Sequence, residues 1–322
     1  MHHITILDGH TLNPGDLDWG PVLDLATTQV FERSTPEEVL ERSRESTILI
    51  VNKVRLDRKI LDELPQLQYI CVSATGYNNI DLQAAQEKGI PVSNVAGYST
   101  PAVAQHVFAL LLAYTNRVQE HAESVREGSW SRSPDFCYWL APVQELGGKT
   151  IGIYGLGQIG QAVARLALAF GMEVLAHHKH PERDRMEGVR FVSLEQLFEA
   201  GDVVTLHAPL HANNQEIVNR HLLQRMKPDA LLVNTSRGGL INEHDLAVAL
   251  DEGWLGAALL DVLSSEPPPA DHPLTQHPKC WITPHLAWAS QQSRQRLLLE
   301  VVQNIQAFMN GTHRNPVSLP AA

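Results

Sequence analysis

Residues 150–170 constrain the fold of this chain more than any other segment, because three glycines there join an apolar run to an amphipathic stretch. The run Thr150–Tyr154 predicts a buried strand, and the apolar spacing after the glycines predicts a helix. Gly155, Gly157 and Gly160 form the pattern G-x-G-x-x-G between them. In such a turn the first glycine permits the bend, the second lets a pyrophosphate approach the backbone, and the third lets helix and strand pack closely. The segment predicts a dinucleotide site, with a purely structural turn as the alternative.

Predicted strands and helices alternate along most of the chain, which indicates parallel sheets with crossover helices. The 322 residues are enough for two domains. Strands are expected at Ile4–Asp8, Gln29–Glu32, Thr47–Val51, Tyr69–Val72 and Pro91–Ser93, and again at Thr150–Tyr154, Glu173–His177, Asp202–Leu206, Leu231–Thr235, Gly256–Val262 and Trp281–Thr283. We predict an α/β protein of two doubly wound parallel-sheet domains. One is a Rossmann-like nucleotide domain and the other a smaller, flavodoxin-like substrate domain, with a cleft between them.

The domain boundaries follow from the last helix pattern, Ser290–Phe308, which comes after the final strand of the nucleotide domain. We expect this helix to cross back onto the first domain. The substrate domain then comprises residues 1–98 plus 290–322, and the dinucleotide domain comprises residues 99–289.

Two segments of the dinucleotide domain have other features. Between Pro101 and Glu123 the apolar spacing predicts one long helix, expected to bridge the domains. Residues 128–147 carry four aromatic side chains and show no clear period. This segment is either an arm exchanged between subunits or an ordinary surface loop.

Composition excludes several classes of function. A formal net charge of −11 argues against nucleic acid or an anionic membrane as the main partner. The longest apolar runs are too short to span a bilayer, and no signal-peptide pattern is seen at the start. Three unpatterned cysteines suggest a reducing compartment, so a cytoplasmic location is expected, and no metal site is predicted.

The strand predicted at Glu173–His177 leads into His178 and Lys179. NAD-binding domains usually place an acidic residue here, where it binds the ribose hydroxyls. Here the position is a histidine, followed by Lys179 and, further on, Arg183 and Arg185. This favours NADP, or use of both cofactors. Alternatively these are exposed loop residues, and NAD binds through the rest of the site.

Three later strands are followed by Arg237, Glu266 and His285. In open α/β sheets ligands bind at the carboxyl ends of strands, so these side chains are expected at one site. An arginine can clamp a carboxylate, and a histidine oriented by a carboxylate can exchange a proton. Asp261 interrupts an apolar strand, where a carboxylate needs a partner; a nicotinamide carboxamide would be one. Taken singly, Arg237 could be a surface residue and His285 a satisfied core histidine.

The chain resembles the D-isomer-specific 2-hydroxyacid dehydrogenase family over nearly its whole length. The resemblance is carried by the glycine turn, Asn234-Thr-Ser-Arg237-Gly-Gly, Asp261-Val-Leu-Ser-Ser-Glu266-Pro-Pro and Thr283-Pro-His285. Within the family it is most similar to the glycerate dehydrogenase, or hydroxypyruvate reductase, branch. The stretches that suggest this branch are Val51–Val54, Thr75–Asp81, Gly97–His106 and His285–Trp288.

The resemblance implies that the protein is a homodimer. It also implies a role for each site residue. Arg237, Glu266 and His285 are the expected catalytic trio. The expected cofactor-binding residues are Gly155, Gly157, Gln158, Ile159, Gly160, His178, Lys179, Thr235, Ser236 and Asp261. The expected substrate-binding residues are Ala74, Thr75, Gly76, Arg237 and Lys53.

The predicted reaction is reduction of hydroxypyruvate or glyoxylate to D-glycerate or glycolate by a nicotinamide cofactor. One alternative is a dehydrogenase for another keto acid, such as pyruvate. A second is a nucleotide-sensing, co-repressor-like binding protein on the same fold. Formate dehydrogenases fit less well, because they carry Gln where this chain has Glu266.

Overall fold

The computed structural model of the protein describes residues 2–317. The chain divides into two compact units. The smaller unit comprises the described residues up to Ser99 together with those from Trp288 onward, and the larger unit comprises Thr100–Ala287. The smaller unit is therefore built from both ends of the chain.

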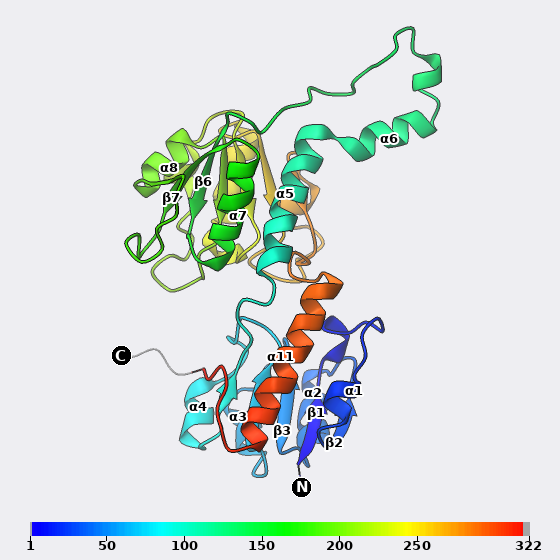
Figure 1. Ribbon diagram of the computed structural model, residues 1–322, viewed down its shortest axis with the longest axis vertical. Helices are drawn as coiled ribbons and strands as arrows, with labels where there is room; N and C mark the ends of the chain where they lie inside the picture. The colour runs from blue at the N-terminus through cyan, green and yellow to red at the C-terminus, as the bar shows by residue number, and fades with distance from the viewer. Residues whose placement is uncertain (1, 318–322) are drawn as a thin grey trace. The chain divides into compact units, whose positions relative to one another are not determined.

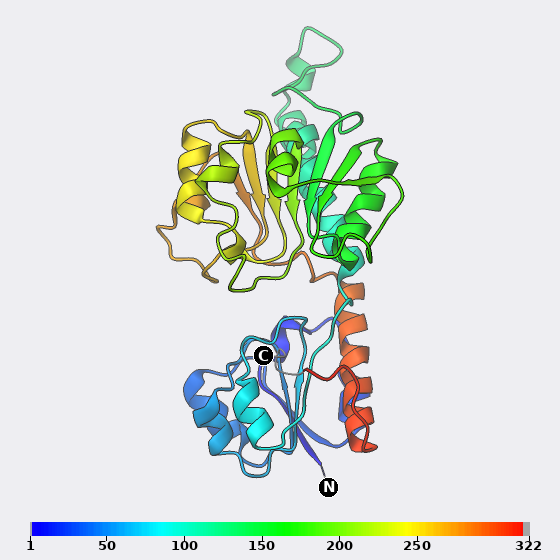
Figure 2. The same cartoon turned by 90° about the vertical axis from the view of Figure 1, so that its left-hand side faces the viewer.

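The smaller unit holds a five-stranded parallel sheet in the order β2-β1-β3-β4-β5. Figure 2 shows this sheet with helices on both sides. This is the order found in flavodoxin-like doubly wound domains. Its strands are β1 His3–Ile6, β2 Thr27–Val30, β3 Ile48–Val51, β4 Tyr69–Val72 and β5 Val92–Ser93. Its helices are α1 Gly20–Leu23, α2 Pro36–Ser43, α3 Arg58–Asp62, α4 Leu82–Glu87 and α11 Gln291–Met309.

Helices cover both faces of this sheet, which explains why the central strands read as continuous apolar runs. All four residues of β3 are buried. On one face Leu297, Val301 and Ile305 of α11 join a core with Ile48 and Ile50. The carboxyl-terminal helix thus completes the core of the amino-terminal sheet.

The larger unit holds a seven-stranded parallel sheet in the order β12-β11-β10-β9-β6-β7-β8. Six neighbouring strands reproduce the Rossmann order, and β12 adds a seventh at the edge. Its strands are β6 Thr150–Tyr154, β7 Glu173–His177, β8 Val189–Phe191, β9 Val203–Leu206, β10 Leu231–Asn234, β11 Ala257–Leu260 and β12 Cys280–Ile282. Its helices are α5 Thr100–Asn116, α6 Val118–Arg126, α7 Gln158–Ala169, α8 Leu194–Ala200, α9 Arg220–Leu223 and α10 Glu243–Asp251. Two parallel-sheet α/β domains are the predicted fold class, which is confirmed.

The single helix predicted from Pro101 to Glu123 is wrong, because two helices meet at Arg117. That residue has φ +48°, in the left-handed region, which ends α5 before α6 begins. Neither glycine nor proline marks the break in the sequence. The guanidinium of Arg117 pairs with Glu120 and lies over the ring of Tyr114, and these contacts hold the bend. From the bend, α6 and the segment after it extend beyond the body of the larger unit, as Figure 1 shows.

Two smaller differences have local causes. The edge strand β8 is absent from the sequence prediction, and its three residues are too few to show a period. The apolar spacing of residues 56–64 predicts one helix, but α3 begins only at Arg58, because Asp57 caps it by accepting a hydrogen bond from the amide of Ile60. Leu56 instead forms a β-bridge with Ile80.

Candidate active site

Three neighbouring strands of the larger unit end in the loops that carry the predicted catalytic residues. Strand β10 leads to Arg237, β11 leads to Glu266, and β12 leads to His285. The three strands are consecutive in the sheet and parallel. Their loops therefore emerge at the same edge, as the strand-end argument requires.

His285 and Glu266 form a close pair. His285 Nδ1 lies 2.6 Å from Glu266 Oε2, and the other carboxylate oxygen accepts a hydrogen bond from the amide of Leu263 at 3.0 Å. Both side chains are partly accessible to solvent, 26% for the histidine and 34% for the glutamate. The carboxylate sets the orientation of the ring, and solvent access lets the pair exchange protons.

Asp261 anchors the loop that carries His285. The carboxylate, 1% exposed, accepts hydrogen bonds from the hydroxyl of Thr283 at 2.6 Å and from the amides of Leu286 at 2.9 Å and Ala287 at 2.8 Å. His106 Nε2 lies 3.0 Å from the Thr283 hydroxyl, and burial lowers the pKa of this histidine. The sequence prediction assigned Asp261 to the nicotinamide carboxamide. The structure gives the carboxylate protein partners that were not foreseen.

The Arg237 loop packs directly against the loop that leads to Glu266. A Cβ atom on Gly238 would lie 1.9 Å from the carbonyl carbon of Leu263, so only glycine fits there. Asn234 ties the loop down: its side-chain amide donates to the carbonyl of Arg237 at 2.9 Å, and its side-chain oxygen accepts from the amide of Ser236 at 3.0 Å. Arg237 itself donates to the carbonyl of Ser236 at 2.7 Å.

The glycine turn has the geometry that a dinucleotide requires. Gly155 has φ +96° and its Cβ would lie 2.6 Å from the amide nitrogen of Ala208, while a Cβ on Gly160 would lie 2.1 Å from the carbonyl oxygen of Gly155. Gly157 differs, because its φ of −73° suits any residue and its Cβ would meet no protein atom within 4 Å. The folded chain does not need glycine there, but close approach of a ligand does.

Gln158 and Ile159 open helix α7 directly after this turn. The Gly157 cap supplies no side-chain hydrogen bond to the first amides of the helix. Unpaired amides and the helix dipole suit a pyrophosphate. The residues present therefore fit a nicotinamide dinucleotide.

Two buried polar atoms near this edge have no hydrogen-bond partner within the described chain: Thr235 Oγ1 after β10 and His207 Nδ1 after β9. Thr235 was predicted as a cofactor contact, and its orphaned hydroxyl is consistent with that role. His207 was missed. Burial lowers its pKa to about 3, so its ring is neutral, and Nε2 lies 2.9 Å from the hydroxyl of Thr205.

The segment after β7, where the adenosine ribose was predicted to bind, contains an acidic side chain that the sequence prediction did not include. His178 follows β7, and its Nε2 lies 2.6 Å from Asp184 Oδ2. Arg183 also binds Asp184, and Lys179 is exposed to solvent. The prediction treated this position as basic because Asp184 lies six residues further along the chain.

The predicted substrate loop lies in the smaller unit, after β4. Thr75 donates its hydroxyl to the carbonyl of Val95 at 3.0 Å, and the carbonyl of Ala74 accepts from the amide of Val95 at 3.0 Å. These bonds leave the loop from Ala74 to Gly76 tied to the chain after β5. These two bonds use the Thr75 hydroxyl and the Ala74 carbonyl. They do not use the amide groups of the loop, which are the donors proposed for the substrate carboxylate.

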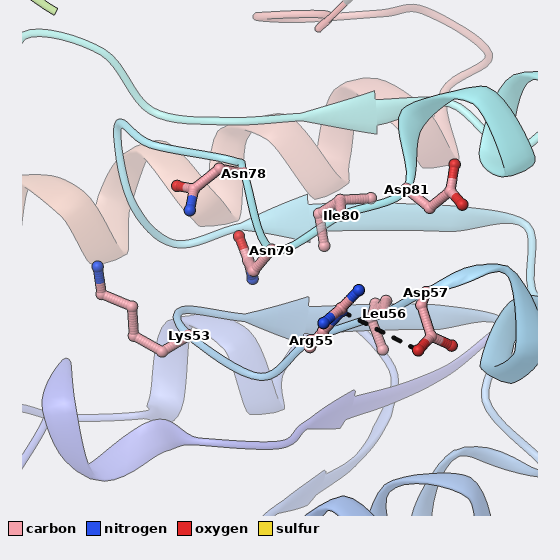
Figure 3. Close-up of a pocket in the computed structure, with 8 residues that line it drawn as sticks. All are labelled: Lys53, Arg55, Leu56, Asp57, Asn78, Asn79, Ile80 and Asp81. Atoms are coloured by element: carbon pink, nitrogen blue, oxygen red, sulfur yellow. Dashed lines mark ion pairs between the residues drawn. The ribbon is translucent and has the colours of Figure 1, made fainter. Parts of the chain in front are cut away.

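Lys53 belongs to a separate hollow of about 510 Å³ at the same end of this sheet (Figure 3). Asn78 and Asn79 line it, but Ala74, Thr75 and Gly76 do not. Asp8 shapes the Lys53 loop, because its carboxylate accepts hydrogen bonds from the amides of Asn52, Lys53 and Val54 at 2.8, 2.6 and 2.9 Å. Asp8 was missed, although its place at the end of the first predicted strand was a usable signal.

A Rossmann-type domain with a dinucleotide-binding turn and a histidine–carboxylate pair at the strand ends defines a nicotinamide-dependent dehydrogenase. Among residues 2–317, no helix is long and apolar enough to cross a membrane.

Comparison with known proteins agrees with this class. A profile described as "D-isomer specific 2-hydroxyacid dehydrogenase, NAD binding domain" matches residues 108–287. The chain is 42% identical over 320 residues to the hydroxypyruvate reductase of Blautia hydrogenotrophica, covering 98% of this chain and 99% of that protein. It is 39% identical over 285 residues to the glycerate dehydrogenase of Methylorubrum extorquens, covering 88% and 89%. A solved structure of an acyclic imino acid reductase in complex with NADPH and D-Arg is similar with a TM-score of 0.84 and 32% identity, covering 98% and 100%. The chain belongs to the D-isomer-specific 2-hydroxyacid dehydrogenase family.

Proposed function

We propose that this enzyme reduces hydroxypyruvate or glyoxylate to D-glycerate or glycolate with a reduced nicotinamide cofactor. The observation that carries the proposal is the 2.6 Å pair between His285 Nδ1 and Glu266 Oε2 at the carboxyl edge of the dinucleotide-binding sheet. Reduction of a ketone or aldehyde needs a proton donor, and this pair can supply one. The relatives named hydroxypyruvate reductase and glycerate dehydrogenase support a small 2-oxo acid as substrate.

The proposed chemistry divides between cofactor and protein. The cofactor, when bound, supplies a hydride to C2 of the acid. His285 Nε2 gives a proton to the carbonyl oxygen as it becomes a hydroxyl, and the ring is left neutral. Glu266 stabilises the imidazolium before transfer and keeps Nδ1 oriented. In the oxidative direction His285 takes the proton back, so high pH favours oxidation.

Substrate binding is assigned to cationic and backbone donors. Arg237 is proposed to hold the carboxylate and polarise the carbonyl group, because a guanidinium can donate two parallel hydrogen bonds. Backbone amides of Ala74, Thr75 and Gly76 are proposed to bind the same carboxylate, by resemblance to the family. Lys53 is proposed to contact the substrate hydroxyl.

The cofactor is proposed to bind along the glycine turn, Gln158 and Ile159, with Thr235, Ser236 and Asp261 toward the nicotinamide end. His178 and Lys179 are proposed to lie at the adenosine ribose. Their type favoured NADP or use of both cofactors. The acidic side chain of Asp184 pairs with His178, so the residue types at this position no longer favour NADP over NAD.

The deciding experiment is a panel of 2-oxo acids assayed with NADH and with NADPH. We expect hydroxypyruvate or glyoxylate to give the highest kcat/KM. Preference for pyruvate or a bulkier keto acid would instead support the alternative, a dehydrogenase for another keto acid. A protein that binds the cofactor but reduces none of the acids would support the co-repressor-like alternative.

The enzyme is further proposed to be a homodimer formed through residues 128–147. Trp130, Phe136 and Trp139 in this segment are 53%, 89% and 69% exposed, a large apolar surface for one extended segment. Analytical ultracentrifugation tests the proposal. Replacement of Phe136 and Trp139 by serine is expected to give monomers, and a dimer unchanged by both replacements would exclude this segment as the interface.

A cytoplasmic location is proposed for the enzyme. Cys71, Cys137 and Cys280 are free thiols in the described chain, which suits a reducing compartment. Fractionation of cells that produce the full-length protein tests this, and recovery with membranes or in the medium would contradict it.

A further inference from the structure

Asp184, His178 and Arg183 form a linked cluster at the end of β7, where the adenosine ribose of a dinucleotide is expected. His178 Nε2 lies 2.6 Å from Asp184 Oδ2. Arg183 contacts both carboxylate oxygens, through Nε at 3.1 Å to each and through Nη2 at 2.6 Å to Oδ2. The side chains of His178 and Asp184 are 11% and 17% exposed, whereas Arg183 is 68% exposed. The carboxylate is thus enclosed while its cation faces solvent.

The hydrogen bonds of His178 define which ring nitrogen carries the proton. The backbone amide of Leu156, inside the glycine turn, donates to His178 Nδ1 at 3.0 Å. A nitrogen that accepts a hydrogen bond has no proton, so Nε2 is the N–H that donates to Asp184. His178 in this arrangement is a neutral bridge from the glycine turn to a carboxylate. It brings no positive charge to the ribose position.

Asp184 does bring a negative charge. Its hydrogen bond from Arg183, and then that from His178, lower the pKa of the carboxyl group to about 2. The group is therefore ionised at neutral pH. Dinucleotide domains that select NAD place a carboxylate at this point, where it accepts the ribose hydroxyls and repels a 2′-phosphate. Here the end of the strand supplies a histidine, and the histidine holds a carboxylate from six residues further on.

We propose that Asp184, positioned by His178, is the residue that discriminates between the two cofactors, and that it selects NADH. Arg183 would be the natural partner of a 2′-phosphate, but it is already bound to Asp184. A 2′-phosphate would have to displace the carboxylate and tolerate its charge nearby. The inference rests on the proposed use of a nicotinamide dinucleotide, and it assigns the specificity of that site.

The test measures cofactor binding without substrate, by fluorescence titration of NADH and NADPH. The wild-type protein is expected to bind NADH more tightly than NADPH. In Asp184→Asn the ratio of the NADPH Kd to the NADH Kd is expected to fall at least tenfold, because the charge is lost and Arg183 is released. Asp184→Ser repeats the measurement with a smaller neutral side chain, in case the asparagine variant fails to fold.

Glu182→Gln is the matched control. Glu182 lies two residues away, is 81% exposed and pairs with Arg185 at 2.7 Å, so its loss removes the same charge from the same segment. We expect the Kd ratio to be unchanged. The double variant Asp184→Asn with Arg183→Gln is expected to lose the gain in NADPH binding, which would identify Arg183 as the released cation. Competition by 2′,5′-ADP against 5′-AMP should follow the same order, because these fragments differ only at the 2′ position.

The outcomes separate this inference from the proposed reaction. Binding of both cofactors with a Kd ratio that Asp184→Asn and Asp184→Ser leave unchanged would overturn the role of Asp184. An equal change in Glu182→Gln would overturn it too, because bulk charge would then explain the effect. Failure of the wild-type protein to bind either cofactor would instead overturn the proposed function. Selective binding without turnover of any 2-oxo acid would support Asp184 while removing the proposed reaction.

Discussion

The amide of His285 donates a hydrogen bond to the backbone carbonyl of Asp261 at 2.9 Å, so the proposed proton donor is held by the end of the neighbouring strand. His285 has φ +52°, a left-handed conformation that costs a residue other than glycine some free energy. The Asp261 carboxylate also binds the amides of Leu286 and Ala287, the two residues that follow. One buried residue thus fixes the backbone on which the histidine is mounted.

Asp261→Asn is expected to lower both stability and turnover. An amide has one acceptor oxygen in place of two, so at least one loop donor loses its partner at a buried site. The free energy of unfolding should fall by about 1–3 kcal/mol, with kcat reduced as the His285 loop loosens. Chemical denaturation and steady-state kinetics measure the two effects. Asp251→Asn is the control, because Asp251 is 74% exposed; equal losses in both variants would contradict the anchoring role.

Glu266→Gln tests the histidine–carboxylate pair. The amide keeps the size of the side chain but removes the negative charge that faces His285 Nδ1. We expect kcat to fall about 10²–10⁴-fold, the range usual for general acid–base groups, while the Kd for NADH measured by fluorescence stays within twofold. Glu252→Gln, at an exposed position after α10, serves as the control. A parallel loss of cofactor affinity would show that Glu266 acts on binding rather than on proton transfer.

Two glycines of the turn are expected to respond in opposite ways to alanine. At Gly157 no protein atom lies within 4 Å of the added Cβ, so the free energy of unfolding should change by less than about 1 kcal/mol. Cofactor affinity should nevertheless drop tenfold or more, because the methyl group fills the space of the ligand. At Gly160 the Cβ would lie 2.1 Å from the carbonyl oxygen of Gly155, so unfolding of the cofactor-free protein should occur at a clearly lower temperature. Unchanged affinity in Gly157→Ala would argue against a pyrophosphate at this turn.

His207 is expected to make the fold sensitive to acid. Burial lowers its pKa from 6.5 to about 3. Between these values the unfolded chain binds a proton that the folded chain excludes, so stability falls as pH decreases from 6.5 toward 3. The contribution of this group approaches about 1.4 kcal/mol per pH unit. Urea denaturation between pH 7 and pH 4 should therefore show a shallower acid loss in His207→Gln. His313→Gln, at an exposed position, should keep the wild-type slope; identical slopes in all three proteins would mean that His207 titrates normally.

Much of the site could be predicted because its residues follow a regular pattern. Parallel strands end at one edge of the sheet, so the loops that carry Arg237, Glu266 and His285 could be placed at that edge without coordinates. The glycine spacing likewise predicted the turn, and the structure adds which glycines the fold itself requires. The parallel α/β class followed from the alternation of short apolar runs and helical periods.

Other features depend on contacts between segments that no local pattern connects. The bend at Arg117 depends on the rings and carboxylate around that side chain, so the long apolar period predicted one helix. Asp184 lies in a polar stretch with no period, and its contact with His178 forms only when the chain folds back there. Asp8 becomes important because the amides of residues 52–54 converge on it.

The sequence by itself determined the two parallel-sheet domains, the dinucleotide turn and the residue types available for chemistry. This is possible because apolar periodicity and the constraints on glycine act over a few neighbouring residues. The tertiary structure decided which charged and polar groups meet, above all that the carboxylate of Asp184 pairs with His178 after β7. The hydrogen bonds that join His178 to Asp184 and to the amide of Leu156 follow no helix or strand period, so they are set only when the chain folds.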